Sequence, residues 1–333
     1  MDKDLARLIE VMKARQRFVV TSHHNIDGDG IGTLLSFYFL LTSLGKEAVM
    51  MNDGNIPYFY QFLPEVEKII SYQNFLALYP DYHTTFDALV VVDCSNLARL
   101  GKAEEIAQGF SLVINVDHHP DNSRFGTINW IASEASSTLL VYTLFKELKI
   151  PLNQKVATTI MNGLISDTGG FTFVALDRRM LLIVEDLIRA GARTSEIMHH
   201  NFRCRRIEAL KLLGKALERL TYDSELGVSF TYITQEDFQA YDAREEDTEG
   251  IVDYGLYIPG AEIAVLFKEI GREEFKVSLR AQREREVISI AHHFGGGGHF
   301  KAAGFKIRGD LQAVIQKVMQ YIQYASQQKI VAH

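Results

Sequence analysis

Short apolar runs alternate with amphipathic segments through the first two thirds of the chain. Runs rich in β-branched residues predict buried strands, and apolar residues that recur at i, i+3 and i+4 predict helices. The strand-like runs cover residues 17–21, 48–51, 86–92 and 112–116. The helix-like segments cover residues 31–44, 134–148, 153–165, 178–189 and 194–220. Strands that alternate with helices indicate an α/β fold with a doubly wound, mainly parallel sheet.

The pattern changes after the last of these helices. A second group of strand-like runs covers residues 227–233, 261–267, 275–279 and 303–307, and residues 311–325 predict a closing helix. This indicates a smaller C-terminal α/β domain with a mixed sheet. We therefore predict a first domain over residues 1–190, a long linker helix over 191–222 and a second domain over 223–333, with the active site in the cleft between the domains.

Acidic residues and histidines follow several of the predicted strands and one helix. Because the carboxyl ends of parallel strands meet at one edge of a sheet, we expect these side chains to gather there. Carboxylates with some imidazoles suit Mn²⁺ or Mg²⁺ better than Zn²⁺. So many acids in one pocket would repel one another without cations, and two ions about 3.5–4 Å apart form the clamp used in phosphate ester hydrolysis. The residues are His23, Asp27, Asp29, Asp93, Asp117, His118, His119 and Asp167.

Each of these residues also has an ordinary structural interpretation. An Asp after a strand is often a helix N-cap, and adjacent histidines are often a hydrogen-bonded core pair. Gly28, Gly30 and Gly32 could mark a dinucleotide-binding loop, but Asp27 and Asp29 would repel a pyrophosphate and the glycine spacing is wrong. Four separate acid-bearing ends favour a metal site over four independent caps.

Composition narrows the class of protein. The chain has 333 residues, of which 47% are hydrophobic and 23% charged, as in soluble globular proteins. Its formal net charge of 35 − 42 = −7 argues against coating long duplex nucleic acid but allows a short anionic substrate in a local pocket. Two cysteines, Cys94 and Cys204, imply no disulfide framework, and no apolar run has the ~20 residues of a membrane span. We expect a cytoplasmic protein.

Four motifs in this order resemble those of the DHH phosphoesterase family. They are His23-x-x-x-Asp27-x-Asp29, Val91-Val92-Asp93-Cys94-Ser95-x-x-x-Arg99-x-Gly101, Asp117-His118-His119-Pro120-x-Asn122 and Ser166-Asp167-Thr168-Gly169-Gly170-Phe171. Residues 294–305 resemble the glycine-rich signature of the DHH-associated C-terminal domain, and residues 277–280 resemble that domain's substrate-facing strand. The resemblance covers nearly the whole chain. Ile26 and Cys94 depart from the residues usual in these motifs, but neither is a ligand position.

The resemblance implies a role for each site residue. One cation would be held by His23, Asp27 and Asp93, and the other by Asp29, Asp93, His118 and Asp167, so that Asp93 bridges the two ions. His119 would act beside the phosphate, and Asp117 would orient a histidine. The implied catalytic residues are thus His119, Asp93 and Asp117. The implied substrate-binding residues are Arg280, Gly296, Gly297, Gly298, His299 and Arg99.

Within the family, the two-domain layout is most similar to the bacterial nanoRNase group. The first domain would then be the catalytic DHH domain and the second the substrate-binding domain. The implied enzyme is a phosphodiesterase and phosphatase that cleaves short oligoribonucleotides, or the 3′-phosphate of adenosine 3′,5′-bisphosphate (pAp), with a water activated by two metal ions. Mn²⁺ is the expected cation, with Mg²⁺ and Co²⁺ as alternatives.

The expected partners follow from this activity. They are short single-stranded RNA or DNA oligonucleotides or a nucleotide bisphosphate, with no long duplex nucleic acid and no membrane, and the chain would be a monomer or a homodimer. Three alternatives stay open: a phosphodiesterase for cyclic or linear dinucleotides such as pApA and pGpG, a manganese inorganic pyrophosphatase, and a non-catalytic nucleotide-binding regulator.

Overall fold

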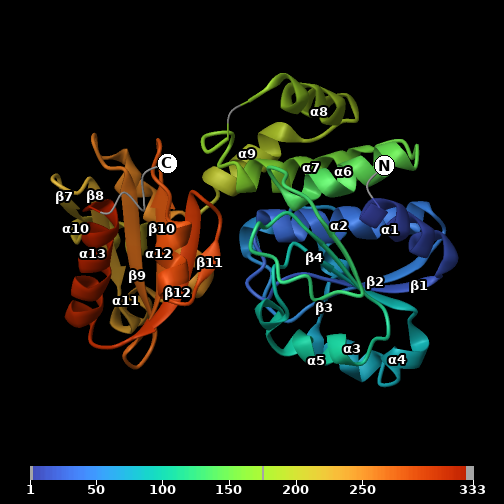
Figure 1. Ribbon diagram of the computed structural model, residues 1–333, viewed down its shortest axis with the longest axis horizontal. Coiled ribbons are helices and arrows are strands. Elements are labelled where there is room, and N and C mark those ends of the chain that lie inside the picture. Colours follow the sequence, from blue (N-terminus) through green and yellow to red (C-terminus); the bar gives the residue numbers. More distant parts are fainter. Residues whose placement is uncertain (1–2, 175, 328–333) are drawn as a thin grey trace. The chain divides into compact units, whose positions relative to one another are not determined.

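The computed structural model describes residues 3–174 and 176–327 (Figure 1). The chain divides into two compact units, Met1–Cys204 and Arg205–His333. No helix among the described residues has the length and apolar character needed to cross a membrane.

The first unit is built on a six-stranded sheet in which every neighbouring pair of strands is parallel. The strand order is β3-β2-β1-β4-β5-β6. The central strands β4 and β5 are buried along their whole length, which explains their uninterrupted apolar sequences. The strands are β1 (Arg17–Thr21), β2 (Glu47–Asn52), β3 (Ile70–Ser71), β4 (Ala88–Val92), β5 (Val113–Asp117) and β6 (Ile128–Ile131).

Helices cover both faces of this sheet (Figure 1). Alternate residues of β4 enter different cores: Val90 and Val92 pack in the core that contains α2, whereas Leu89 and Val91 pack in the core that contains α3. The helices are α1 (Lys3–Ala14), α2 (Gly28–Ser43), α3 (Tyr72–Leu78), α4 (Tyr82–Thr85), α5 (Glu104–Gln108), α6 (Ser137–Glu147), α7 (Gln154–Asp167), α8 (Arg178–Arg189) and α9 (Thr194–Phe202). The 3₁₀ turns are η1 (Tyr58–Tyr60), η2 (Val66–Lys68) and η3 (Leu97–Ala103).

The second unit contains a mixed six-stranded sheet in the order β11-β12-β10-β9-β8-β7. Its pair β8–β9 is parallel and the other pairs are antiparallel. The strands are β7 (Thr221–Asp223), β8 (Val228–Ile233), β9 (Ile263–Gly271), β10 (Glu274–Ala281), β11 (Gly297–Gly298) and β12 (Ala302–Arg308). The helices and 3₁₀ turns are α10 (Ile207–Glu218), α11 (Gln235–Tyr241), η4 (Glu245–Thr248), η5 (Ile251–Tyr257), α12 (Ile288–His293) and α13 (Leu311–Gln327).

These elements confirm the predicted fold class, a mainly parallel first sheet and a mixed second sheet. The prediction of one helix over residues 194–220 is wrong, because α9 and α10 are separated by residues 203–206. The two halves of that pattern are buried in different cores: Ile197 of α9 packs in the core of the first unit, and Leu212 of α10 packs in the second. Strand β6 was not predicted, because Ile128–Ile131 has only four residues and its buried positions alternate with half-buried ones.

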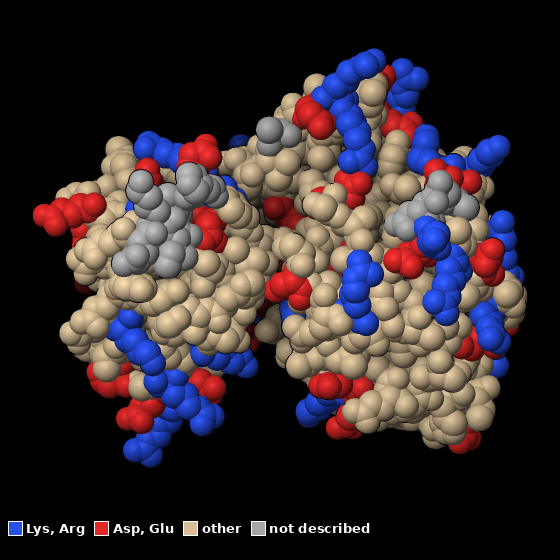
Figure 2. All heavy atoms as spheres, in the orientation of Figure 1, with Lys and Arg blue, Asp and Glu red and all other residues tan. Residues whose placement is uncertain are grey.

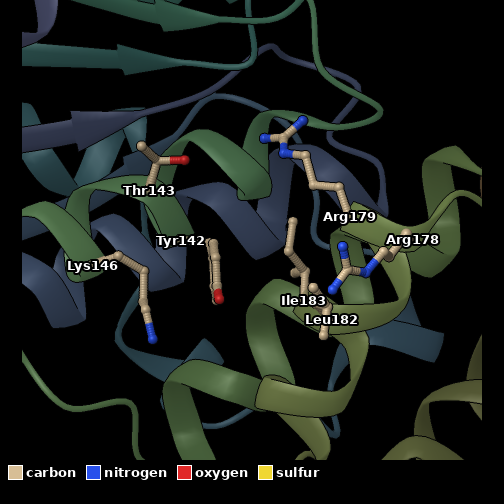
Figure 3. A pocket seen from close by; sticks show the side chains of 7 residues that line it. All are labelled: Tyr142, Thr143, Lys146, Arg178, Arg179, Leu182 and Ile183. Carbon is tan, nitrogen blue, oxygen red and sulfur yellow. The ribbon is translucent and has the colours of Figure 1, made fainter. Parts of the chain in front are cut away.

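Charges of both signs are interspersed on the face drawn in Figure 2, where Lys and Arg lie beside Asp and Glu. A hollow of about 620 Å³ lies between α6 and α8 of the first unit (Figure 3). Tyr142, Lys146 and Arg179 are among the side chains that line it. None of the residues predicted for the metal or substrate sites lines this hollow, so the candidate site lies elsewhere.

Candidate metal centre

Four of the predicted ligands lie at the ends of four elements of the first unit. His23 follows β1, Asp93 follows β4 directly, and His118 follows β5. Asp167 is the last residue of α7. Asp93 has a φ of 51°, a left-handed conformation that costs a non-glycine residue about 1–2 kcal/mol. The parallel topology therefore brings residues from distant parts of the sequence to one edge of the sheet, as the pattern predicted.

Two aspartates belong to the start of α2. Asp27 is the N-cap residue, and its Oδ1 accepts the backbone N–H groups of Asp29 and Gly30, each at 3.0 Å. Asp29 lies in the first turn and is buried, whereas the Asp27 side chain is about half exposed. The cap interpretation of Asp27 is thus correct, and the same oxygen also faces a histidine.

The side chains form two groups that share Asp93. In the first group, His23 Nε2 lies 3.7 Å from Asp27 Oδ1 and 3.6 Å from Asp93 Oδ2. Asp93 therefore turns one carboxylate oxygen towards this group, and its other oxygen is left for the second. His23, Asp27 and Asp93 offer three ligand atoms within 4.8 Å of one another, as do Asp29, His118 and Asp167, so each set could hold a metal ion.

The second group is centred on His118. Its Nε2 lies 3.6 Å from Asp29 Oδ2, 3.6 Å from Asp93 Oδ1 and 3.3 Å from Asp167 Oδ2. All six side chains predicted as metal ligands thus lie close together, and Asp93 contacts the histidine of each group.

The contacts within these groups suit a cation better than a direct hydrogen bond. His23 Nε2 is buried and makes no hydrogen bond with the described residues. Its separations of 3.6–3.7 Å from two carboxylate oxygens exceed hydrogen-bond length, yet a cation between them would contact all three atoms. A donor set of carboxylates and imidazoles fits Mn²⁺ or Mg²⁺. The residues present therefore fit a divalent metal.

The pKa values of Asp29, Asp167 and His118 are raised because these largely buried side chains lie among several carboxylates. Burial raises the pKa of Asp29 well above its usual value, and Asp93 and Asp167 add to the rise. Burial also raises the pKa of Asp167 to about 7, an effect that His118 opposes. Burial alone would lower the pKa of His118, but the charges of Asp167, Asp29 and Asp93 raise it to about 10. Protons balance the acids here, and divalent cations would replace them in that role.

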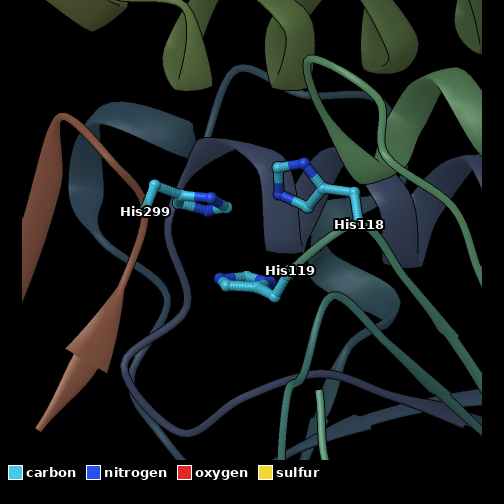
Figure 4. Close-up of side chains that lie close together, drawn as sticks. All are labelled: His118, His119 and His299. Carbon is cyan, nitrogen blue, oxygen red and sulfur yellow. The ribbon is translucent and has the colours of Figure 1, made fainter. Parts of the chain in front are cut away.

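His119 is held on both sides of its ring. Its Nδ1 lies 2.7 Å from Asp117 Oδ1 and its Nε2 lies 3.2 Å from Arg99 Nη1. Since Arg can only donate, Nε2 accepts and Nδ1–H donates to Asp117. Asp117, Asp93 and His119 also form a group that could hold a metal, but the ring atom beside these carboxylates is Nδ1, which carries the proton donated to Asp117. We therefore keep His119 outside the ligand set. The His118 and His119 rings lie edge to face, 4.9 Å apart (Figure 4).

The start of α6 supports the ligands in a way that the sequence did not reveal. The backbone N–H groups of Ser137 and Thr138 donate to Asp29 at 2.6 and 3.1 Å, and the Ser137 hydroxyl donates to Asp93 Oδ1 at 2.8 Å. The sequence predicts a helix over residues 134–148 but does not indicate these contacts. A helix N-terminus also favours a carboxylate through its dipole.

A backbone carbonyl in the preceding loop orients the second histidine. His118 Nδ1 lies 3.0 Å from the carbonyl oxygen of Glu134, which fixes the ring with Nε2 towards the acids. The Glu134 carboxylate forms a two-pronged ion pair with Arg179 of α8 at 2.6 and 2.8 Å. The sequence could not indicate the contact between Glu134 and His118, because any residue type supplies a backbone carbonyl.

The predicted substrate residues of the second unit lie on β10 and around β11, two strands that are separated by β12. Arg280 of β10 has its Nε 3.3 Å from Asp253 Oδ1. Gly297 and Gly298 form β11, preceded by Gly296 and followed by His299. A Cβ on Gly296 would lie 2.1 Å from the carbonyl oxygen of Gly304, so this glycine is needed for close pairing with β12. The glycine run is thus an edge strand.

Comparison with known proteins identifies the family. Residues 17–164 match the DHH family, N-terminal domain, and residues 228–324 match the DHHA1 domain. The bifunctional oligoribonuclease and PAP phosphatase NrnA of Thermus thermophilus is 31% identical over 317 residues, which cover 94% of this chain and 91% of that protein.

Two crystal structures share the fold. An exopolyphosphatase-related protein from Bacteroides fragilis has a TM-score of 0.88 at 23% identity, with 98% of each chain covered. RecJ of Thermus thermophilus in complex with Mn²⁺ has a TM-score of 0.55 at 16% identity, covering 98% of this chain and 54% of that one. With both domains matched and a relative of 31% identity along nearly its whole length, the chain belongs to the DHH phosphoesterase family.

Proposed function

We propose that this protein hydrolyses short oligoribonucleotides and the 3′-phosphate of pAp with two divalent cations, Mn²⁺ first among them. The observation that carries the proposal is the division of six ligand-type side chains into two groups that share Asp93. The substrate class is supported by the 31% identical relative, which is an oligoribonuclease and PAP phosphatase. The interspersed surface charges and the net charge of −7 agree with a short substrate.

The ligand roles follow the geometry of the two groups. His23, Asp27 and Asp93 would hold one cation, and Asp93 with Asp29, His118 and Asp167 would hold the other. When bound, the two cations would supply a nucleophilic water near neutral pH and neutralise charge on the phosphoryl oxygens. The α6 amides and the Ser137 hydroxyl keep the carboxylates in place before any cation arrives.

His119 and Arg99 are the residues that we assign to the reacting phosphate. His119 Nδ1 lies 3.7 Å from Asp93 Oδ1, so the ring adjoins the ligand cluster. Asp117 holds this ring through Nδ1–H, so Nε2, which accepts from Arg99, is the ring atom at which His119 would take a proton. Arg99 contacts Nε2 and carries a permanent positive charge, which would stabilise the charge that builds up on the phosphoryl oxygens.

A digestion series tests the proposal. Full-length protein is incubated with Mn²⁺ and 5′-labelled RNAs of two to twelve nucleotides, and in parallel with pAp and with inorganic pyrophosphate. We expect mononucleotide release from the shortest RNAs and phosphate release from pAp, with pyrophosphate left intact. Hydrolysis of pyrophosphate alone, or no hydrolysis with Mn²⁺, Mg²⁺ or Co²⁺, would contradict the proposed function.

A pair of variants links the activity to the cluster. Asp93→Asn removes the carboxylate common to both groups, and we expect turnover to fall about 100-fold or more, the scale of losing one electrostatic group at a reacting centre. Asp81→Asn is the matched control, because Asp81 is exposed and its side chain caps no backbone group. Equal activity of the two variants would exclude the shared role of Asp93.

A further inference from the structure

Two exposed tyrosines of the second unit lie on one short 3₁₀ turn, η5. Tyr254 is 37% exposed and Tyr257 is 75% exposed, which is unusual for side chains of this size. Residues i and i+3 eclipse each other in a 3₁₀ helix, and the two rings accordingly lie 5.2 Å apart, tilted by 44°. No hydrogen bond from either hydroxyl to a described residue holds them in this exposed position.

The turn that carries them is anchored rigidly to the sheet. Ile251, Val252 and Leu256 are buried in a core with Ala264 and Leu266 of β9. Gly255 lies against the sheet so closely that a Cβ would meet Ser229 Oγ at 2.3 Å and Ala264 Cβ at 2.8 Å. The two rings therefore project from a fixed base, and little ordering would be needed when a flat ligand stacks on them.

Arg280 lies beside this turn. The residue before Tyr254 is Asp253, whose Oδ1 lies 3.3 Å from Arg280 Nε. Buried residues alternate with half-buried ones along β10, so Ser278 and Arg280 share the face opposite to Leu279. A guanidinium and two aromatic rings are thus presented by adjoining elements.

Next to Arg280, this face carries little side-chain bulk. On β12, Ala302 pairs with Arg280 and Gly304 pairs with Ser278. These three small residues leave backbone close to the surface of the sheet, where an extended chain could lie flat. A cation, small neighbours and stacking rings are the features that single-stranded nucleic acids require: the cation for a phosphate and the rings for a base.

We propose that Tyr257, together with Tyr254, is a base-stacking platform that selects nucleotide substrates, while Arg280 holds a phosphate. This inference rests on the proposed function and adds specificity residues to it. Stacking is tolerant of base identity, because every base has a flat face. The platform would therefore favour oligonucleotides over phosphate esters without a base, with little preference between adenine and guanine.

The test compares two substrates that differ only in their bases. Wild type, Tyr257→Leu and Tyr257→Phe are assayed with Mn²⁺ on the dinucleotide pApA and on the same backbone with abasic residues. We expect Tyr257→Leu to raise KM for pApA about tenfold or more, with kcat and the abasic KM nearly unchanged, as loss of a base contact requires. Tyr257→Phe, which keeps the ring, should behave like wild type. Tyr257 is exposed, so the variants should retain the wild-type melting temperature.

A matched control and a binding measurement complete the design. Tyr324 of α13 is 54% exposed, and its helix packs in the core on the other face of the sheet, so Tyr324→Leu should leave both KM values unchanged. Calorimetric titration of pApA in EDTA should show the same loss of affinity for Tyr257→Leu. An equal rise of KM on both substrates, or no rise, would overturn the platform. Failure of wild type to cleave either substrate would instead overturn the proposed function.

Discussion

Replacing Ser137 with Ala removes the hydroxyl that donates to Asp93 at 2.8 Å. Ser137 is fully buried and Asp93 is 2% exposed, so water cannot replace the lost donor without entering the cluster. A hydrogen bond to a charged acceptor contributes about 1.5–3 kcal/mol. At about 1.4 kcal/mol per factor of ten, this corresponds to roughly a 10- to 100-fold change in the affinity of Asp93 for a cation. Losses of this size are typical when a partner that orients a metal ligand is removed.

The assay is a calorimetric titration of metal-free protein with Mn²⁺, followed by kcat at saturating Mn²⁺. We expect the Ser137→Ala affinity to fall roughly 10- to 100-fold, with a smaller loss of kcat, because saturating metal restores the occupied site. Ser136→Ala is a matched control: Ser136 is equally buried, and its hydroxyl lies 2.7 Å from that of Thr138 rather than against a ligand.

The two serine variants lose the same atom from neighbouring buried positions. A general effect of the lost hydroxyl on stability would therefore appear in both, whereas an effect on the metal should appear only in Ser137→Ala. Unchanged Mn²⁺ affinity in Ser137→Ala, or an equal loss in Ser136→Ala, would refute the inference that this hydroxyl holds Asp93 for a cation.

Three further outcomes are expected. Mn²⁺ at about 100 times its Kd should stabilise the protein by about 2.7 kcal/mol, or roughly 5–10 °C in Tm for a unit the size of Met1–Cys204, and EDTA should abolish the shift in a thermal scan; Asp93→Asn should show no shift at all. His119→Ala should bind Mn²⁺ as wild type does by titration, yet lose turnover about 100-fold or more; loss of Mn²⁺ binding would place His119 among the ligands. Arg179→Ala should lower activity less than about fivefold, because its pair with Glu134 is largely exposed on the Arg179 side and such pairs contribute at most about 1 kcal/mol; a larger fall in initial rate would show that the pair controls the loop more tightly.

The sequence was sufficient to predict which strands deliver the candidate ligands. The apolar runs that became β4 and β5 are followed at once by Asp93 and by His118 and His119, and parallel strands bring such ends together. This argument uses only the side-chain pattern and the rule that parallel strands share an edge. The argument therefore succeeds where the side chain itself is the functional group and where the preceding strand is buried on both faces.

The same argument could not find the groups that hold the ligands. Asp29 is bound by backbone N–H groups of Ser137 and Thr138, more than 100 residues away in the sequence, and any residue type supplies such a donor. The carbonyl of Glu134 that orients His118 also cannot be identified from the sequence, because every residue has a backbone carbonyl. These contacts depend on where α6 begins relative to α2, which is set by tertiary packing and not by local propensity.

Arg99 shows a second limit. The family resemblance implies a place in the site for Arg99, but its residue type alone is equally compatible with a structural salt bridge. The position of Arg99 depends on a local feature: η3 carries Arg99 and bends at Gly101, whose φ of +65° a residue with a Cβ adopts only with strain. With that backbone, Arg99 Nη1 lies 3.2 Å from His119 Nε2.

Asp27 shows that a capping residue and a candidate ligand need not be alternatives. Its Oδ1 accepts two backbone N–H groups at 3.0 Å and also lies 3.7 Å from His23 Nε2. The cap fixes the carboxylate at the start of α2, so little side-chain freedom is left to be lost when a cation binds. An Asp at a strand end is therefore a better candidate ligand, not a poorer one, when it also caps the next helix. If the cap and the ligand roles are treated as alternatives, the sequence underestimates the support for Asp27 as a metal ligand. The helix cap in fact holds this carboxylate in the position that a ligand would need.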